Sequence, residues 1–269
     1  MKVLRATENQ LHKFRFLRKA DAPFWVMAKY YALHTSHYFA NRHRHKGYRA
    51  RKLEFRQLKE TLSLDSDWFT GNIPTWLRFF DEQNLYARPH LDCLEIGSWQ
   101  GLSAYFLLSQ LANARLTCVD TWEGADEHKA GKAKGKTVLS RIEQSFDANL
   151  AVFGERVRKY KGTSFDFFAE HFRPSVFDLI YVDGSHHSDD VIVDAIKCFE
   201  MLKVGGVMVF DDYFWRYYDR VIDNPAGALN MFLRLKLHQL EIIGFDYQLV
   251  IRKTADSARF AEEAAAVAG

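Results

Sequence analysis

Three aspartates that follow apolar runs are the residues best suited to chemistry in this sequence. Asp183 follows residues 179–182, and Asp211 and Asp212 follow residues 207–210; both runs have the composition of buried strands. Carboxylates that converge on one crevice repel one another unless a cation lies between them. Oxygen ligands with room for water and substrate suit Mg²⁺, or Mn²⁺ or Ca²⁺ in its place. The pattern therefore predicts a divalent metal site at these three aspartates, the alternative being that each acid only caps a helix or orders a loop.

His186 lies three residues after Asp183 and is the candidate for proton transfer. A hydroxyl group beside a divalent cation has a lowered pKa, and a nearby imidazole can accept its proton. We therefore expect His186 and Asp183 to form the catalytic group. Two alternatives stay open: His186 ligates the metal, or His186 or its neighbour His187 caps the helix predicted to start near Ser188.

A glycine-containing loop follows the first predicted strand, residues 91–96. It contains Gly97 and Gly101, and a helix is predicted to begin at about Leu102. A strand, tight loop and helix in this order hold nucleotide-like ligands, and glycine lets a ligand approach the backbone closely. The loop departs from the Gly-x-Gly-x-x-Gly pattern, and Glu95 would place a negative charge near a phosphate. A ligand with an amino group and no phosphate therefore fits this loop better.

Asp120 ends the second predicted strand, about 20 residues beyond that loop. In nucleotide-binding folds a carboxylate at this place accepts hydrogen bonds from both hydroxyls of a ribose. We expect this role for Asp120, with capping of a loop or helix as the alternative.

Apolar runs and helical spacings alternate from Leu91 onward. Strands are predicted near residues 91–96, 115–119, 156–161, 177–182, 206–211, 239–243 and 246–252, and helices near 75–83, 102–112, 138–150, 165–171, 188–202 and 226–237. Runs that are apolar on both faces predict mostly parallel strands covered by helices on both sides. The last two runs, joined at Gly244 and Phe245, predict a closing hairpin. The fold class is therefore α/β: a Rossmann-like, mostly parallel seven-stranded sheet with helices on both faces and a helical N-terminal extension.

The bulk composition predicts a globular protein of the cytoplasm. The 269 residues, 48% of them hydrophobic, can bury a substantial core. The three cysteines each lie in an apolar stretch, which favours reduced side chains, and no apolar run approaches the roughly 20 residues that span a bilayer. The predicted organisation is an extension over residues 1–60, a helical approach segment and substrate-side cap over 61–90, the main domain over 91–255, which includes a polar loop over 123–137, and a tail over 256–269.

The N-terminal extension differs in charge from the rest of the chain. Residues 1–60 hold 15 Lys and Arg against 4 Asp and Glu, a net charge of +11, whereas the remainder carries −8. Aromatic residues are interleaved with these cations, and a break between two helices is predicted near residues 21–23. Three roles are compatible with this pattern: a solvated helical face, peripheral contact with an anionic membrane surface, or nucleic-acid binding, which is the least favoured.

The motifs in their order resemble those of class I S-adenosylmethionine-dependent methyltransferases over about residues 91–253. The resemblance rests on the segments 95–101, 119–120, 162–164, 177–186 and 202–206, which read EIGSWQG, VD, GTS, FDLIYVDGSH and LKVGG. Within that superfamily the chain most resembles the group that includes macrolide-sugar O-methyltransferases and, more distantly, catechol O-methyltransferase. The resemblance implies that residues 91–255 form a methyltransferase domain.

The resemblance also assigns roles to individual residues. The implied cofactor-binding residues are Glu95, Gly97, Ser98, Gly101, Ser103, Asp120, Thr121, Trp122, Gly162, Thr163, Ser164 and Asp183. Gly97, Ser98 and Gly101 would line the methionine and ribose portion, whereas Gly162, Thr163 and Ser164 would lie by the adenine. Ser164 is also a candidate N-cap for the helix that follows. Asn72, Trp99 and Tyr213 are the candidate acceptor-binding residues.

The expected function is transfer of a methyl group from S-adenosyl-L-methionine to a hydroxyl of a sugar or small polyol-like metabolite, assisted by Mg²⁺. Catechol O-methyltransferase has lysine at the position that matches His186, whereas sugar-modifying relatives have histidine, which favours a sugar-like acceptor. The alternatives are a metal-independent small-molecule methyltransferase and a non-catalytic cofactor-binding protein tethered by its basic extension. A homo-oligomer is compatible with the sequence.

Overall fold

The structure, a computed structural model, describes residues 2–124 and 136–256 and centres on one sheet. The strand bounds are β1 (Leu91–Ile96), β2 (Ala114–Asp120), β3 (Val157–Lys161), β4 (Phe177–Val182), β5 (Leu202–Phe210), β6 (Leu240–Phe245) and β7 (Leu249–Lys253). These seven strands lie in the order β3-β2-β1-β4-β5-β7-β6. The pairs from β3 to β5 are parallel, whereas β7 is antiparallel to both β5 and β6. The predicted α/β fold class and the closing hairpin are confirmed.

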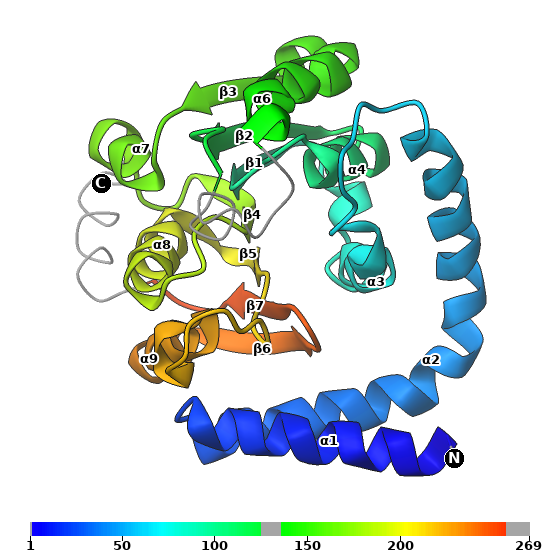
Figure 1. Cartoon of the computed structure of the whole chain (residues 1–269), viewed down its shortest axis with the longest axis vertical. Coiled ribbons are helices and arrows are strands. Elements are labelled where there is room, and N and C mark those ends of the chain that lie inside the picture. Colours follow the sequence, from blue (N-terminus) through cyan, green and yellow to red (C-terminus); the bar gives the residue numbers. More distant parts are fainter. Residues whose placement is uncertain (1, 125–135, 257–269) are drawn as a thin grey trace.

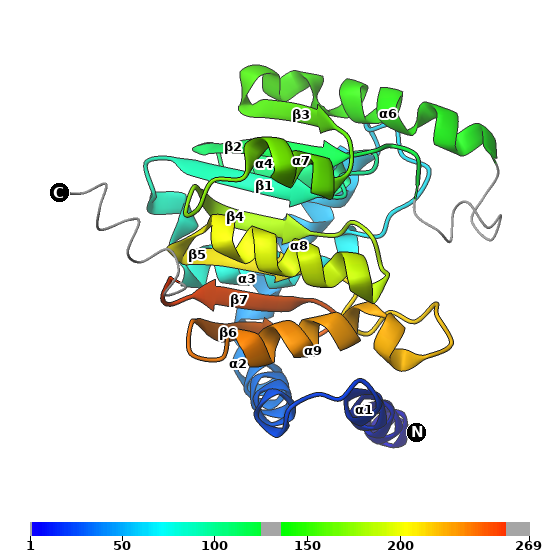
Figure 2. The ribbon, with the colours of Figure 1, turned by 90° about the vertical axis from the view of Figure 1, so that its left-hand side faces the viewer.

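Helices cover both faces of this sheet (Figures 1 and 2). The helices beside the sheet are α3 (Ile73–Glu82), α4 (Leu102–Gln110), α6 (Lys136–Leu150), α7 (Ser164–His171), α8 (Ser188–Met201) and α9 (Pro225–Leu235). One hydrophobic core joins α7, α8 and α9 to the sheet, and a second core joins α3, α4 and α6 to the opposite face. Neighbouring strand residues divide between them: Ile180 belongs to the first core, and Leu179 and Tyr181 to the second. The strands are therefore apolar on both faces because both faces are buried.

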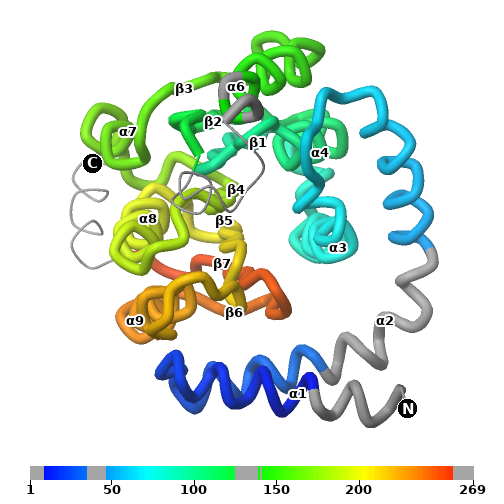
Figure 3. The backbone as a smooth tube through the Cα atoms, viewed as in Figure 1, coloured from blue at the N-terminus to red at the C-terminus, as the bar shows by residue number. Residues whose placement is uncertain are grey.

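The N-terminal extension forms two long helices that pack against the edge of the sheet. They are α1 (Lys2–Lys19) and α2 (Phe24–Lys59), separated at the predicted break, where Asp21 has a φ of 54°. Leu17 and Tyr30 are fully buried, and the ring of Tyr30 meets that of Phe245 on β6 at 5.1 Å in an edge-on arrangement. The amide of Asn230 on α9 donates a 2.8 Å hydrogen bond to the carbonyl of Ala20. Figure 3 shows both helices running past β6, so the extension covers the edge strand that would otherwise be open.

The element boundaries depart from the prediction in a few places. β5 begins at Leu202, not near 206, because Leu202 pairs with Phe177 and a register shift in β4 accommodates the glycines that follow. The turn of the β6–β7 hairpin follows Phe245, slightly later than predicted. The N-cap of α7 is Thr163 and not Ser164: Thr163 and Asp166 form a reciprocal capping box. Most of the predicted polar loop, 123–137, and of the tail, 256–269, lies outside the described residues.

None of the described helices is long and apolar enough to cross a membrane.

Candidate active site

A cavity of about 840 Å³ lies where the carboxyl ends of the parallel strands meet. Its walls come from the loops that follow β1, β2, β3, β4 and β5, which are far apart in the sequence. Ligands in open α/β sheets bind at this edge because the connections diverge there and leave a crevice. Seven of the predicted cofactor-binding residues line the cavity: Gly97, Asp120, Thr121, Gly162, Thr163, Ser164 and Asp183.

The loop after β1 lies unusually close to the end of β4. Gly97 has a φ of 85°, and a Cβ atom at this position would lie 1.9 Å from the carbonyl oxygen of Asp183. Only glycine fits at this position, because it adopts a positive φ without strain and has no Cβ atom to overlap the Asp183 carbonyl. The close approach brings the loop that faces the cofactor cavity against the aspartate predicted to bind metal.

Asp120 holds the same loop from its other side. Its Oδ2 accepts hydrogen bonds of 2.8 Å from the backbone N–H groups of Ser98 and Trp99, and its Oδ1 accepts one of 2.6 Å from Trp122. Burial raises the pKa of Asp120, and these hydrogen bonds oppose the shift. The carboxylate therefore orders the backbone of the loop as well as facing the cavity.

Glu95 and Ser103 lie beneath the loop and not in the cavity wall. Glu95 is 1% exposed and accepts a 2.6 Å hydrogen bond from the Ser103 hydroxyl. Burial raises the pKa of Glu95 to about 7. Ser98, Gly101 and Trp122 are likewise absent from the cavity wall, so five of the predicted cofactor-binding residues do not line the cavity.

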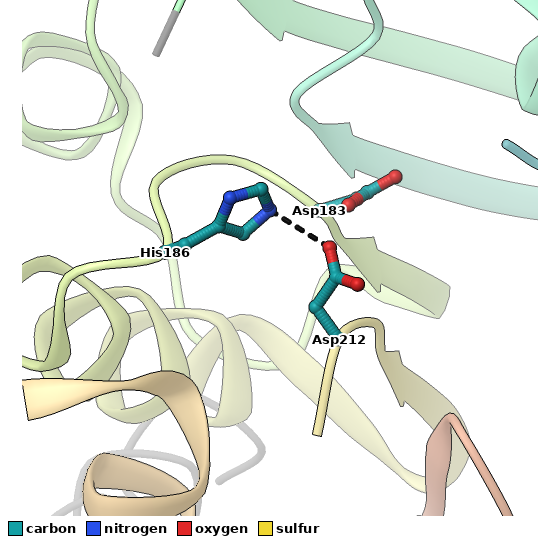
Figure 4. Close-up of side chains that lie close together, drawn as sticks. All are labelled: Asp183, His186 and Asp212. Carbon is teal, nitrogen blue, oxygen red and sulfur yellow. Dashed lines mark ion pairs between the residues drawn. The ribbon is translucent and has the colours of Figure 1, made fainter. Parts of the chain in front are cut away.

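The cluster of possible metal ligands differs from the predicted one in a single aspartate. Ligand atoms of Asp183, His186 and Asp212 lie within 4.8 Å of one another, and His186 Nε2 is 2.8 Å from Asp212 Oδ2 (Figure 4). Asp211, predicted as a ligand, is not a member of this cluster. Its Oδ2 instead accepts hydrogen bonds from Tyr181, from Gln248 at 2.9 Å and from Asn72 at 3.4 Å. The neighbouring His187, not His186, caps α8.

The hydroxyl of Tyr181 links the two buried carboxylates. It lies 2.8 Å from Asp183 Oδ2 and also donates to Asp211 Oδ2. Burial and the charges of Asp211 and Asp212 raise the pKa of Asp183 well above its usual range, and burial raises the pKa of Asp211 to about 6. Three crowded carboxylates beside an imidazole are a donor set that fits a divalent cation, because a cation relieves their repulsion.

The candidate acceptor-binding residues have different positions. Trp99 lines the cavity, with Trp68 at 5.6 Å between ring centroids, and Trp215 lines it beside His186 at 4.5 Å. Asn72 contacts Asp211 but is not part of the wall.

Tyr213 is in the core, so the structure contradicts its predicted place in the acceptor pocket. It is fully buried and donates a 2.6 Å hydrogen bond to Asn230. Asp212 has a φ of 56°, a left-handed turn of the chain immediately before Tyr213.

Several residues in the site were not predicted. Tyr181 could have been predicted from the sequence, because side chains alternate along a strand and those of Tyr181 and Asp183, two residues apart, lie on the same side. Tyr247 lies in the β6–β7 turn, lines the cavity and donates a 2.5 Å hydrogen bond to Asp212 Oδ1. Asp194, on α8, also faces the cavity. No local pattern marks these last two residues, because each comes from an element that only the tertiary fold brings to the site.

Comparisons with known proteins agree with this architecture. Residues 94–213 match the family described as a methyltransferase domain. No curated protein sequence matches the chain. A solved structure from Corynebacterium glutamicum is similar at a TM-score of 0.51 and 16% identity, covering 78% of this chain and 92% of that one.

MycE, a methyltransferase from the mycinamycin biosynthetic pathway solved in complex with Mg, SAH and mycinamycin VI, is similar at a TM-score of 0.51 and 16% identity. The match covers 72% of this chain and 52% of MycE, so this chain spans about half of the MycE length. At this identity the two structures establish the fold, whereas the family match establishes the domain. Residues 94–213 are therefore a methyltransferase domain, within a chain that has the Rossmann-like fold of the similar solved structures.

Proposed function

We propose that this enzyme transfers the methyl group to a hydroxyl oxygen of a sugar or small polyol-like acceptor, with a divalent cation bound beside the donor. The observation that carries the proposal is the convergence of Asp183, His186 and Asp212 at one wall of the cavity. MycE, which has the same fold, was solved with both Mg and SAH bound, which agrees with a cation beside the methyl donor.

The cofactor would lie along the ordered loop after β1. The methionine portion would face Gly97 and Trp99, where the absence of a Cβ leaves the backbone open, and the ribose would lie by Asp120, which faces the cavity. The adenine would then extend toward Thr163 and Ser164 at the end of β3. Asp120 already accepts three backbone hydrogen bonds, so it would hold the ribose through its remaining lone pairs.

Asp183 and Asp212 would supply oxygen ligands to the cation, and Asp211, which also lines the cavity, would be a further negative charge beside them. When bound, the cation supplies positive charge that lowers the pKa of an acceptor hydroxyl and offsets the repulsion among these carboxylates. Tyr181 and Tyr247 hold the carboxylates in place, since each donates a hydrogen bond to a member of the group.

His186 would accept the proton that the acceptor hydroxyl releases. Asp212 Oδ2, 2.8 Å from Nε2, orients the imidazole and stabilises its protonated form, while Trp215 packs against the ring. The same nitrogen is also within reach of a cation bound by Asp183 and Asp212. The roles of base and ligand therefore predict different results when His186 is replaced.

The acceptor would bind between indole rings and acidic side chains. Trp68, Trp99 and Trp215 offer flat apolar surfaces, and the carboxylate of Asp67 lies in the same wall. Carboxylates accept hydrogen bonds from hydroxyl groups, and aromatic faces cover the apolar side of a sugar ring. The protein's main contribution to rate would be to hold the hydroxyl oxygen in line with the sulfonium methyl group.

Transfer of labelled methyl from S-adenosylmethionine to a panel of sugars and polyols tests the proposal. We expect transfer to at least one hydroxyl in the presence of Mg²⁺ and none in excess EDTA, with binding of S-adenosylhomocysteine retained in both. Full activity of metal-free protein in EDTA would favour the metal-independent alternative. Cofactor binding without transfer to any acceptor would favour a non-catalytic protein.

Replacement of single residues separates the roles. Asp212→Asn should abolish cation binding in a calorimetric titration. His186→Gln should abolish transfer but retain cation affinity if His186 is the base, whereas a loss of affinity would identify it as a ligand. Asp189→Asn is the matched control, because its side chain is 88% exposed on the neighbouring helix; a similar loss of cation binding in this variant would contradict the assignment.

Contact with an anionic membrane surface is one of the roles still open to residues 1–60, beside that of a solvated helical face. Arg15, Arg18 and Lys19 are exposed on α1, and Phe24 is 82% exposed at the start of α2. Because the opposite side of α1 belongs to the core, truncation would confuse folding with membrane binding. Substitution of the three cations by Gln, followed by liposome flotation, tests the contact directly; unchanged flotation would remove it.

A further inference from the structure

The segment 61–69, between α2 and α3, contributes to the cavity wall although no helix or strand holds it (Figure 1). Asp67 and Trp68 line the cavity, and the ring of Trp68 lies 5.6 Å from that of Trp99 between centroids. A segment without a helical or sheet hydrogen-bond pattern depends on side chains to pair its backbone groups. The contacts that fix this segment therefore also fix the part of the cavity assigned to the acceptor.

Gln100, in the loop after β1, makes a two-way contact with this segment. Its Oε1 accepts a 2.8 Å hydrogen bond from the backbone N–H of Asp65, and its Nε2 donates one of 3.0 Å to Asp65 Oδ2. Because a backbone N–H can only donate, the orientation of the amide is determined. Gln100 is 1% exposed and is absent from the cavity wall, whereas its neighbour Trp99 lines the cavity. Two adjacent residues of one loop thus contact the cavity and the segment.

Asn149, on α6, makes the corresponding contact with Ser63. Its Oδ1 accepts a 2.8 Å hydrogen bond from the backbone N–H of Ser63. Its Nδ2 donates to the carbonyl of Ser63 at 3.1 Å and to that of Gln100 at 2.8 Å. Asn149 is 5% exposed, so the oxygen and nitrogen of both amides are paired in buried positions. A buried and fully paired polar network holds its members in one arrangement.

The loop that contains Gln100 is the one along which the cofactor is proposed to lie. Gly97 and Trp99 line the cavity, and Asp120 accepts hydrogen bonds of 2.8 Å from the backbone N–H groups of Ser98 and Trp99. A ligand that packs against this loop favours its ordered form. Through Gln100 the same order extends to Asp65, which lies outside the cavity wall and two residues before Asp67.

We propose that Gln100 is a positioning residue of the acceptor site: by holding Asp65, it fixes Asp67 and Trp68 to the loop that carries the cofactor. This inference rests on the proposed function, in which Asp67 and Trp68 contact the acceptor. Gln100 itself contacts neither ligand. Its contact with Asp65 places the acceptor wall relative to the methyl donor, and the relative orientation of two reactants contributes strongly to rate.

Hydrogen exchange of the full-length wild-type protein, with and without S-adenosylhomocysteine, tests this link. Saturating ligand should slow exchange at the backbone N–H groups of Ser63 and Asp65 by about ten-fold or more, because it disfavours opening of the loop that holds them. The N–H of Arg88, which donates to the carbonyl of Leu85 before β1, is the control and should change less.

No slowing at Ser63 and Asp65, or slowing no greater than at Arg88, would overturn the inference while leaving the proposed function intact. Failure of S-adenosylhomocysteine to bind in a calorimetric titration would instead count against the proposed cofactor site. This measurement needs no variant, so it does not depend on how a substitution affects folding.

Substitution of Asp65 tests the contact through acceptor kinetics, because Asp65 is exposed and its side chain is not part of the core. With the best sugar of the panel, Asp65→Ala should raise KM about five-fold or more, while the affinity for S-adenosylhomocysteine stays within about two-fold. Asp65→Asn retains an oxygen that can accept from Gln100, so its KM should be close to that of the wild type.

Asp189→Ala is the control for loss of an exposed carboxylate and should leave both KM and cofactor affinity unchanged. An unchanged KM in Asp65→Ala would show that the acceptor wall does not need the contact with Gln100. Equal losses of acceptor and cofactor binding would show that the contact only stabilises the fold. Either result would make the inference wrong.

Discussion

Lys13 and Asp246 form a 3.0 Å ion pair that joins the first helix to the turn between β6 and β7. The next residue, Tyr247, donates a 2.5 Å hydrogen bond to Asp212 in the active site. The side chain of Asp246 is 63% exposed, so the pair by itself adds little to the free energy of unfolding. The position of the ion pair matters more: through Asp246 the N-terminal extension contacts the β6–β7 turn, and Tyr247 in the same turn orients Asp212, a proposed metal ligand.

Tyr247→Phe should weaken cation binding by roughly ten-fold, since hydrogen-bond partners that orient metal ligands typically have effects of this size. The variant removes only the donor to Asp212 Oδ1. Titration calorimetry with Mg²⁺ or Mn²⁺ measures the change. Tyr105→Phe, on α4 and away from the cavity, is the control. Unchanged affinity in Tyr247→Phe would show that Asp212 does not need this hydrogen bond.

Leu17→Ala should destabilise the whole protein by roughly 2–5 kcal/mol, because the side chain is fully buried in the core shared with the sheet. Leu11→Ala, on the same helix but 50% exposed, should change the free energy of unfolding by less than about 0.5 kcal/mol. Urea unfolding measures both. If Leu17→Ala changed the free energy of unfolding as little as Leu11→Ala does, α1 would be loosely attached and not part of the core.

Gly97→Ala should destabilise the protein by ~3 kcal/mol or more, because the new Cβ would overlap the backbone of Asp183 at 1.9 Å. Gly205→Ala is a close control: its φ is 80°, similar to the 85° of Gly97, but no atom lies within 4 Å of the new Cβ. Gly205→Ala should therefore destabilise the protein only through the strain of an alanine at positive φ, by about 1 kcal/mol. Similar losses in the two variants would contradict the close approach between the β1 loop and β4.

Glu95 should make the stability of the protein depend on pH. Its pKa is raised to about 7 in the folded state, so between the unfolded value and 7 the folded state holds a proton that the unfolded state has released. Stability from this residue is therefore present at low pH and lost as pH rises, by about 1.4 kcal/mol per pH unit. Glu95→Gln removes the titration, so its stability relative to the wild type should increase from pH 5 to pH 7. Parallel urea-unfolding curves across this range would refute the shift.

Local sequence patterns predicted most of the strands and helices and the edge of the sheet at which the cavity lies. Apolar runs bounded by turn residues predict strands because each strand is buried on both faces, and the observed β1 and β4 have the predicted bounds, residues 91–96 and 177–182. Parallel strands end at one edge of a sheet, so Asp183, Asp211 and Asp212 could be assigned to one crevice from their positions after strands alone.

Which side chains face that crevice was decided by the tertiary structure. The turn at Asp212 is followed by Tyr213 in the core, and partners from α3, β4 and the end of the β6–β7 hairpin hold Asp211 away from the cluster that His186 joins. Tyr247 and Asp194 reach the cavity from elements with no motif of their own. The physical reason is range: periodicity and turn chemistry act over a few residues, whereas the direction of a side chain depends on φ at single positions and on partners far away in the sequence.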